Sequence, residues 1–550
     1  MKRVFFVLVC LSVWLFALPP AIEKAIKRSG IPKSDLSIYI KEAGDGRRIV
    51  ASLNTNKIRT PASVIKVLTT YAALSELGFD YRWPTQVYMS GRLKRGVLHG
   101  DLIVKGYGDP SLDSEDVEEM AQKVHAAGIR KITGAIVIDR SYFRVGSKNS
   151  SHFDENLYSP YNAMPDAMMF NRRVSTVCVI PNRNEVKKRD PDASYVLHNE
   201  LKRVDKPCRG RYAWPQVKIE ERGGVSHLHL KGTISKRCGK REICKVLTKP
   251  YKSFYYAFKS ALKRHGTEVH GSMRLRKVPS RARLLFTHFS EPLEKIVSHT
   301  AKKSDNLYAR HLLLLLGAKR YGAPATVEKG RRAVEEILKH IGAVGSEKLK
   351  IDNGSGLSRR ARLSAKTLAG VLDHAYERYG MRWMKTLSIA GVDGTIKRRF
   401  RGTVVKANAW MKTGTLKRVK NIAGYVKSKQ GVYYTVVIIA NTAKGRWRAS
   451  KLQNEIVIWL RTYKKGKRSK QKPMSVSLNG SGYYIQAGAF SKYPSEAYIK
   501  RLGTFSLPFS VKREERYKVL IGPYTNERQA REILKKVKER INVHAFIVRR

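Results

Sequence analysis

The chain has 550 residues, 42% of them hydrophobic, which is enough for several packed domains and excludes an intrinsically disordered protein. Lys and Arg total 108 against 44 Asp and Glu, a formal net charge of +64. Such an excess favours binding to polyanions, of which nucleic acid, anionic lipid and an anionic cell wall are the main classes.

The amino-terminal segment 1–21 has the pattern of a secretory signal peptide. Basic Lys2 and Arg3 precede an apolar run from Val4 to Leu18. This run is shorter than the roughly 20 residues of a membrane-spanning helix, although an uncleaved anchor is the alternative. We therefore expect an exported protein of the periplasm or cell envelope, which meets the cell wall and no nucleic acid.

Four cysteines follow the signal, all in one region of the chain: Cys178, Cys208, Cys238 and Cys244. An oxidising compartment favours disulfides or buried free thiols. A zinc site with His227 and His229 is the weaker reading, because no Cys-x-x-Cys knuckle is present. We expect neither a metal nor a cofactor, and the pairing of the cysteines stays open.

Predicted elements alternate between helical and β-rich regions. Apolar residues at helical spacing predict a helix over Ala62–Leu77 that ends at Gly78. From about Trp83 to Ser290, short alternating segments separated by Gly and Pro predict a β-rich region. The later predicted elements are helices over Leu293–Gly317 and Thr326–Ile341, strands over Val404–Ala440 with a turn at Ser428–Gly431, and a closing helix near Ser450–Thr462.

Ser63 and Lys66 form a Ser-x-x-Lys motif at the start of the first predicted helix. The motif alone is weak evidence, because Ser260–Lys263 and Ser469–Lys472 match it too. Two further motifs strengthen it, since their order and predicted positions suit a penicillin-recognising serine acyltransferase. They are Ser304-Asp305-Asn306, at a loop-to-helix junction, and Lys412-Thr413-Gly414, on a strand.

These residue types suit acyl transfer. A serine hydroxyl is a poor nucleophile until a base takes its proton, and one helical turn brings Lys66 beside Ser63. Burial and the like charge of Lys412 both lower the pKa of Lys66, as this base requires. We expect the backbone N–H groups of Ser63 and Thr415 to form an oxyanion hole. Ser304 would relay the proton, Asn306 would bind the substrate amide, and Lys412 with Thr413 would hold the terminal carboxylate.

With these motifs, the sequence resembles the class C low-molecular-mass penicillin-binding proteins, which are serine D-alanyl-D-alanine carboxypeptidases and endopeptidases of peptidoglycan. Four further segments typical of that family are Gly100–Leu112, Asp352–Arg359, Ile389–Phe400 and Lys412–Val426. Arg359 resembles a substrate-side arginine, with an ordinary surface charge as the alternative.

The resemblance implies a multidomain α+β protein. Its catalytic domain would be β-lactamase/transpeptidase-like, with an antiparallel sheet flanked by helices. Residues 22–82 and 291–463 would form this domain, and a large β-rich insert at 83–290 would separate the two parts. It also implies peptidoglycan stem peptides as the substrate and β-lactams as covalent inhibitors.

The carboxyl end contains a basic linker at 464–481, followed by an internal repeat of strand, Gly-x-aromatic and helix. Residues 482–550 resemble a small βαββαβ SPOR domain, which implies binding to glycan strands that lack stem peptides and a place at division septa. Gln486 and Tyr524 are the candidate glycan contacts, although the alternative is that such aromatics simply pack.

Two functions compete at this stage. The first is a D-alanyl-D-alanine carboxypeptidase or endopeptidase that β-lactams acylate at Ser63. The second is a catalytically weak peptidoglycan-binding protein with the same fold. All the motif residues that the chemistry needs are present, which favours the enzyme. The sequence leaves open whether it is mainly a carboxypeptidase or an endopeptidase, the third residue of the stem peptide, and the oligomeric state.

Overall fold

The computed structural model describes residues 18–44, 46, 48–146, 148–345, 349–464, 482–491, 493–495, 498–499, 502, 509–524 and 526–549. The chain divides into two compact units at Lys464. Residues 1–17 of the predicted signal peptide and 465–481 of the predicted linker lie outside the described residues. Within the described ranges, no helix combines the length and apolar character needed to cross a bilayer.

A six-stranded antiparallel sheet is the centre of the first unit, with strand order β18-β19-β20-β21-β1-β2. Early and late parts of the chain meet in it, because β1 pairs with β21 along its whole length. The strands are β1 (Leu36–Glu42), β2 (Ile49–Leu53), β18 (Ser388–Ile389), β19 (Ala409–Leu416), β20 (Val419–Lys427) and β21 (Tyr433–Asn441).

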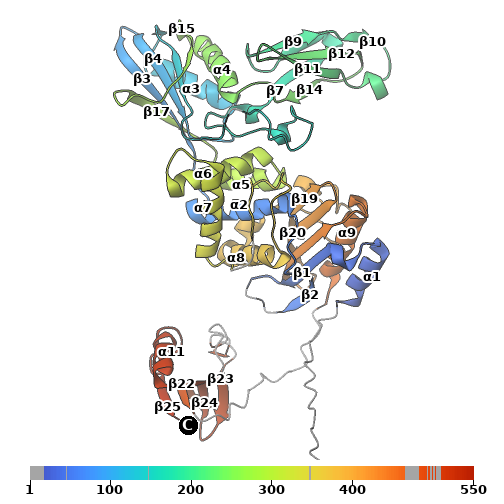
Figure 1. Cartoon of the computed structure of the whole chain (residues 1–550), viewed down its shortest axis with the longest axis vertical. Coiled ribbons are helices and arrows are strands. Elements are labelled where there is room, and N and C mark those ends of the chain that lie inside the picture. The colour runs from blue at the N-terminus through green and yellow to red at the C-terminus, as the bar shows by residue number, and fades with distance from the viewer. Residues whose placement is uncertain are drawn as a thin grey trace, which may run out of the picture. The chain divides into compact units, whose positions relative to one another are not determined.

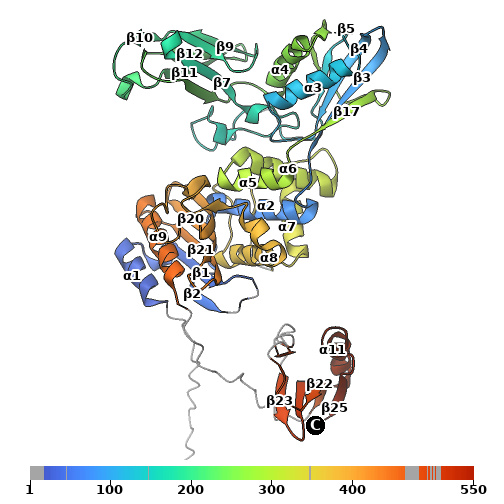
Figure 2. The same cartoon turned by 180° about the vertical axis from the view of Figure 1, so that it is seen from behind.

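Both faces of this sheet are covered by helices, because its strands alternate buried side chains between two cores. On β21, for example, Val437 and Ile439 belong to one core and Val436 and Ile438 to the other. Figures 1 and 2 show the larger group of helices on one side of the sheet and two helices on the other. The larger group is α2 (Lys66–Leu77), α5 (Leu293–Lys302), α6 (Asn306–Tyr321), α7 (Val327–His340) and α8 (Ala365–Met384); the pair is α1 (Pro20–Ser29) and α9 (Arg446–Thr462).

The helices differ from the sequence expectation in detail. The helix predicted from Ala62 begins as a 3₁₀ turn, η2 (Ala62–Ile65), before α2. The single helix predicted over Leu293–Gly317 is two helices, α5 and α6, separated by a break in which Ser304 has a positive φ of 57°. Such a φ costs free energy for a residue with a side chain, so the break is held by its surroundings.

The β-rich insert is built from two lobes. The first is a seven-stranded sheet packed against α3 (Ser114–Ala126) and α4 (Pro250–Arg264). Its strands are β3 (Pro84–Lys94), β4 (Val97–Gly106), β5 (Lys131–Ile132), β6 (Ile136–Asp139), β15 (Glu268–Val269), β16 (Met273–Leu275) and β17 (Arg283–Phe289).

The second lobe contains shorter sheets and the cysteines. Cys208 and Cys238 form a disulfide, whereas Cys178 and Cys244 are free thiols. The disulfide removes two of the thiolates that a zinc site would have used. The strands are β7 (Ser175–Ile180), β8 (Glu185–Lys188), β9 (Tyr195–Asn199), β10 (Lys202–Val204), β11 (Gln216–Arg222), β12 (Val225–Lys231), β13 (Thr233–Ser235) and β14 (Arg241–Lys245).

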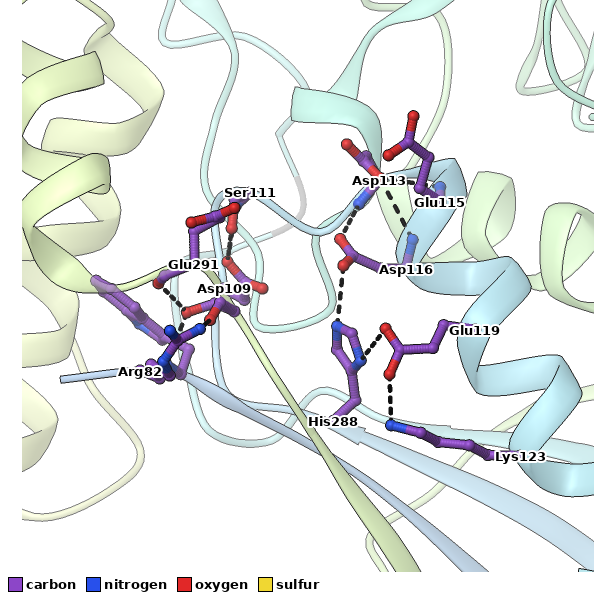
Figure 3. Close-up of polar contacts among 12 residues, drawn as sticks. Arg82, Asp109, Ser111, Asp113, Glu115, Asp116, Glu119, Lys123, His288 and Glu291 are labelled. Carbon is purple, nitrogen blue, oxygen red and sulfur yellow. Dashed lines mark hydrogen bonds and ion pairs between the residues drawn. The ribbon is translucent and has the colours of Figure 1, made fainter. Parts of the chain in front are cut away.

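The chain enters the insert through β3 and leaves it through β17, and these two strands pair with each other. His288 near the end of β17 is 4% exposed and lies between two carboxylates of α3 (Figure 3). Its Nε2 is 3.0 Å from Asp116 Oδ1, and its Nδ1 is 3.6 Å from Glu119 Oε2. Lys123 donates to Glu119 in turn. This polar cluster fastens α3 to the strand that returns to the catalytic region.

The second unit is a four-stranded antiparallel sheet with strand order β23-β24-β22-β25. One face packs on α11 (Glu527–Arg540) in a separate core that includes Ile485, Val519 and Val537. The strands are β22 (Tyr483–Phe490), β23 (Phe509–Arg513), β24 (Tyr517–Tyr524) and β25 (Phe546–Arg549). The first of the two predicted helices falls partly on residues outside the described ranges.

Candidate active site

Ser63 lies in the 3₁₀ turn η2 and is partly exposed, whereas its neighbours from Val64 to Leu74 are buried. Ala62 before it has a φ of 47°, an uncommon conformation for a residue with a side chain. A 3₁₀ turn has three residues per turn, so it aligns residues i and i+3. Lys66 Nζ is accordingly 3.0 Å from Ser63 Oγ.

Lys66 is fully buried, and its Nζ lies among three oxygen atoms. Besides Ser63 Oγ, its Nζ contacts Asn306 Oδ1 at 2.7 Å and the backbone carbonyl of Ser355. A neutral amine has two N–H groups and one lone pair, which matches two carbonyl-type acceptors and one hydroxyl donor. Burial, followed by the positive charge of Lys412, lowers the pKa of Lys66 well below its ordinary value. The lone pair can therefore receive the proton of Ser63.

Lys412 forms a second polar group with Ser304 and Thr413. It is fully buried on β19, and its Nζ donates to Ser304 Oγ at 2.8 Å and to the Thr413 carbonyl at 2.6 Å. Burial lowers the pKa of Lys412 to about 7. The Thr413 hydroxyl donates to Thr395 Oγ1 at 2.9 Å. An amine whose pKa is lowered towards neutral pH, beside a serine hydroxyl, suits proton transfer.

Two glycines let other segments approach Ser63 closely. A Cβ on Gly414 would lie 2.8 Å from the Pro61 carbonyl oxygen and 3.0 Å from the backbone nitrogens of Ser63 and Val64. Gly356 has a φ of +78°, and a Cβ there would lie 2.1 Å from the Ala62 carbonyl oxygen. The turn that carries Ser63 is therefore held between β19 and the Ser355–Gly356 loop.

The open edge of β19 supplies a candidate oxyanion donor. Ala390 N donates to Ala409 O, so the odd-numbered residues of β19 direct their backbone groups to the β18 edge. Strand β18 pairs only as far as Met411. The Thr415 N–H therefore points to an edge without a strand partner among the described residues. This is consistent with an oxyanion hole shared with the Ser63 N–H.

Arg359 contacts the insert. Its Nη1 donates to the Phe153 carbonyl at 2.9 Å, and its guanidinium lies 4.4 Å from the centre of the Phe153 ring. It is exposed and helps to line a pocket of about 420 Å³, together with residues of the insert, of α6 and α7, and of the Asp352–Arg360 loop. No contact between Arg359 and Ser63, Lys66 or Lys412 occurs among the described residues, so its substrate role stays a prediction.

Sequence reasoning assigned no role to two backbone carbonyls of the site. Ser355 O accepts from Lys66, and Tyr161 O, from the insert, accepts from Asn306 Nδ2 at 3.1 Å. A backbone carbonyl has no residue-type signal. The glycines on both sides of Ser355 were the one available hint, because they indicate a loop that approaches another backbone closely.

Comparison with known proteins decides the family. The sequence profile of the D-Ala-D-Ala carboxypeptidase 3 (S13) family matches residues 18–463. The chain belongs to this family. Among curated S13-like relatives, D-alanyl-D-alanine carboxypeptidase DacB of Haemophilus influenzae is 27% identical over 73% of this chain and 84% of its own length. The D-alanyl-D-alanine carboxypeptidase of Actinomadura sp. is 29% identical over 75% of this chain and 77% of its own length.

Solved structures show the same fold. Penicillin binding protein 4 (dacB) from Haemophilus influenzae superposes with a TM-score of 0.68 at 24% identity, over 80% of this chain and 99% of that protein. The same Haemophilus protein complexed with a β-lactam superposes with a TM-score of 0.64 at 25% identity, again over 80% and 99%. The predicted transpeptidase-like fold with a β-rich insert is thus confirmed.

The carboxyl-terminal unit matches the SPOR domain over residues 479–549. The chain is therefore a serine-type D-Ala-D-Ala peptidase of the cell envelope with a peptidoglycan-binding domain. The two predicted glycan contacts lie apart. Gln486 alternates with core residues Ile485 and Ala487, so it faces away from α11, whereas Tyr524 packs against that core with its hydroxyl buried. Gln486 is the better placed of the two for a ligand.

Proposed function

We propose that Ser63 is the nucleophile of a D-alanyl-D-alanine carboxypeptidase or endopeptidase that acts on peptidoglycan stem peptides. The observation that carries this proposal is the 3.0 Å contact between Ser63 Oγ and Lys66 Nζ, in surroundings that lower the pKa of that lysine. Because the neutral amine and the hydroxyl are already in contact, the first proton transfer requires no rearrangement of the site.

We infer the following steps for the reaction. Ser63 Oγ attacks the carbonyl carbon of the penultimate D-alanine while its proton passes to Lys66 Nζ. The backbone N–H groups of Ser63 and Thr415 stabilise the resulting oxyanion. The C–N bond then breaks, and the departing amine takes a proton from Lys66 through the Ser304 hydroxyl. Water finally hydrolyses the acyl-enzyme ester.

The remaining motif residues would bind the substrate. The Asn306 amide lies beside Lys66, where it can also bind the backbone amide of the stem peptide. The charge of Lys412 and the partly exposed hydroxyl of Thr413 favour a terminal carboxylate near Ser304. Arg359 is a candidate contact for a more distant part of the peptide. β-Lactams, which acylate serines of this kind, would occupy the same position as covalent inhibitors.

The catalytically weak alternative has less support. It would require a nucleophile without a working base, yet Ser63, Lys66, Asn306, Ser304 and Lys412 are joined in two hydrogen-bonded groups. For the SPOR domain we propose glycan strands without stem peptides as the ligand, which would concentrate the enzyme at division septa.

Labelling with a fluorescent penicillin tests the nucleophile. We expect Ser63→Ala to abolish covalent labelling, because within the described residues Ser63 supplies the serine hydroxyl that contacts Lys66 Nζ, whereas Ser355 contacts it through the backbone carbonyl. Ser260→Ala is the matched control, since Ser260 also precedes a lysine by three residues but lies on α4 of the insert. We expect that control to label like the wild type. Undiminished labelling of Ser63→Ala would overturn the assignment.

A further inference from the structure

Residue Arg310 is a buried cation close to the site, and no motif includes it. It lies four residues after Asn306 on α6, so the two side chains share one face of the helix. Arg310 is only 4% exposed. Burial lowers its pKa to about 10, and Asp352 and Asp305 are the acids that oppose this effect. A guanidinium at such a position costs free energy, which suggests that it serves the site.

Arg310 holds the segment of the insert that Asn306 also contacts. Its Nη1 donates to the Ala163 carbonyl at 2.5 Å and lies 3.4 Å from the Asn162 carbonyl. Asn306 Nδ2 donates to the carbonyl of Tyr161, in the same turn. Two side chains of α6 therefore hold three successive carbonyls of η3 (Pro160–Asn162) and the residue after it.

The orientation of the Asn306 amide depends on that turn. An amide has a donor end and an acceptor end, and either can face a given neighbour. With the Tyr161 carbonyl on one side, the NH₂ group must face the insert, so Oδ1 faces Lys66 Nζ at 2.7 Å. If the turn moved away, the amide would lose this constraint.

We propose that Arg310 is a positioning residue of the active site, which holds the Pro160–Ala163 turn of the insert against α6 and thereby keeps the Asn306 amide oriented towards Lys66. The positive charge of Arg310 also lowers the pKa of Lys66, which is the change that a base requires. The charged groups that act on Lys66 are Lys412 on β19 and Arg310 on α6, which lower its pKa, and Asp305 at the start of α6, which raises it. This inference rests on the proposed role of Lys66 as the base.

The rate of Ser63 acylation by a β-lactam, measured from pH 5 to 10 on the full chain, tests the proposal. We expect Arg310→Met to move the midpoint of the acidic limb to higher pH and so to lower the rate below that midpoint, because it removes a positive charge that lowers the pKa of Lys66. The rate on the alkaline plateau should also fall, because the Asn306 amide is less constrained. Arg310→Lys retains the charge and should keep the wild-type midpoint.

Arg173→Met is the matched control. Arg173 is 5% exposed and holds the next carbonyl of the same segment, Met164 O, at 2.7 Å. The Arg173→Met variant should have a lower melting temperature but an unchanged pH midpoint of the acylation rate. An unmoved midpoint in Arg310→Met, or an equal movement in Arg173→Met, would overturn the proposal. If Arg310→Met does not fold, Arg310→Gln replaces it under the same criteria. Failure of the wild type to acylate at Ser63 would instead overturn the proposed function.

Discussion

In the proposed mechanism Lys66 determines when Ser63 can react, because only the neutral form of the amine accepts a proton. Burial and Lys412 lower its pKa, so the neutral fraction, and with it the acylation rate, should rise with pH through that lowered pKa and then level off. The opposite sign, a rate that falls as pH rises through this range, would indicate that a protonated group is needed at this step.

We expect Lys66→Arg to lose acylation by a factor on the order of 10²–10⁴, because a guanidinium stays protonated at any accessible pH. Stopped-flow acylation by a fluorescent penicillin would measure the loss. Lys263→Arg, at the other Ser-x-x-Lys pair on a helix, is the control and should react normally. Fast acylation of Lys66→Arg would identify another base.

Gly414 sets how closely β19 approaches the turn that carries Ser63. A methyl group at Gly414 would lie within 3.0 Å of three backbone atoms of the turn that carries Ser63, and none of them is the end of a flexible side chain. Since a 1 Å displacement of reacting groups can cost about 10²-fold in rate, we expect Gly414→Ala to reduce acylation by about that factor. Gly239→Ala, which meets no atom within 4 Å, should change nothing. Equal rates for both variants would show that the turn adjusts freely.

Helices and strands differ in how well the sequence predicts them. The helix predicted over Thr326–Ile341 and the strands β19–β21 follow regular apolar periodicity, and the structure contains them. Helix α8 was not predicted. Its inner face includes Asp373, which pairs with Lys41 at 2.7 Å, so a buried ion pair interrupts the apolar pattern there.

The groups of the candidate site also differ in how well the sequence predicts them. Side chains within recurring motifs, such as Ser63, Lys66, Ser304, Asn306 and Lys412, were predicted as one constellation, and the structure places them in contact groups. The carbonyls of Ser355 and Tyr161 were not, because their role depends on which distant backbone the fold brings near. Contact between the insert and α6 is a tertiary property that no local sequence pattern records.

We expect His288 to make the stability of the junction between the catalytic region and the insert depend on pH. Although burial lowers its pKa, the hydrogen bond and charge of Asp116, with the charges of Glu119 and Asp109, raise it above the ordinary value. A histidine with a raised pKa in the folded state stabilises that state fully below its unfolded pKa of about 6.5, and the contribution is lost as pH rises through the folded pKa.

We therefore expect His288→Asn to lower the melting temperature of the insert more at pH 5.5 than at pH 9. A contribution of about 1 kcal/mol corresponds to roughly 2–4 °C in a region of this size. Differential scanning calorimetry at the two pH values would measure the difference. His99→Asn, at an exposed position of β4, is the control. A His288 effect of equal size at both pH values would mean that the contact is only steric.

At the scale of the whole molecule, the net charge of +64 has to be separated from specific recognition. A cationic protein adheres to any anionic wall, and salt weakens such adhesion because the Debye length is about 8 Å at physiological ionic strength. For the SPOR domain we propose a different kind of contact, through the Gln486 amide on the sheet face opposite α11. An amide hydrogen-bonds sugar hydroxyls without using charge.

These two modes respond in opposite ways when an amidase removes the stem peptides from purified walls. The removed peptides carry carboxylates, so a purely electrostatic protein should bind the stripped wall less well and release in salt. We expect the full-length Ser63→Ala protein, which lacks the hydroxyl needed to form an acyl-enzyme with the stem peptides, to bind stripped wall better than intact wall and to keep much of that binding in high salt. Gln486→Ala in the same background should lose the preference, whereas Lys535→Ala on α11 should keep it. Sedimentation of each variant with intact and stripped walls, at low and at high salt, measures this binding. A preference for intact wall that disappears in salt would contradict glycan recognition by the SPOR domain.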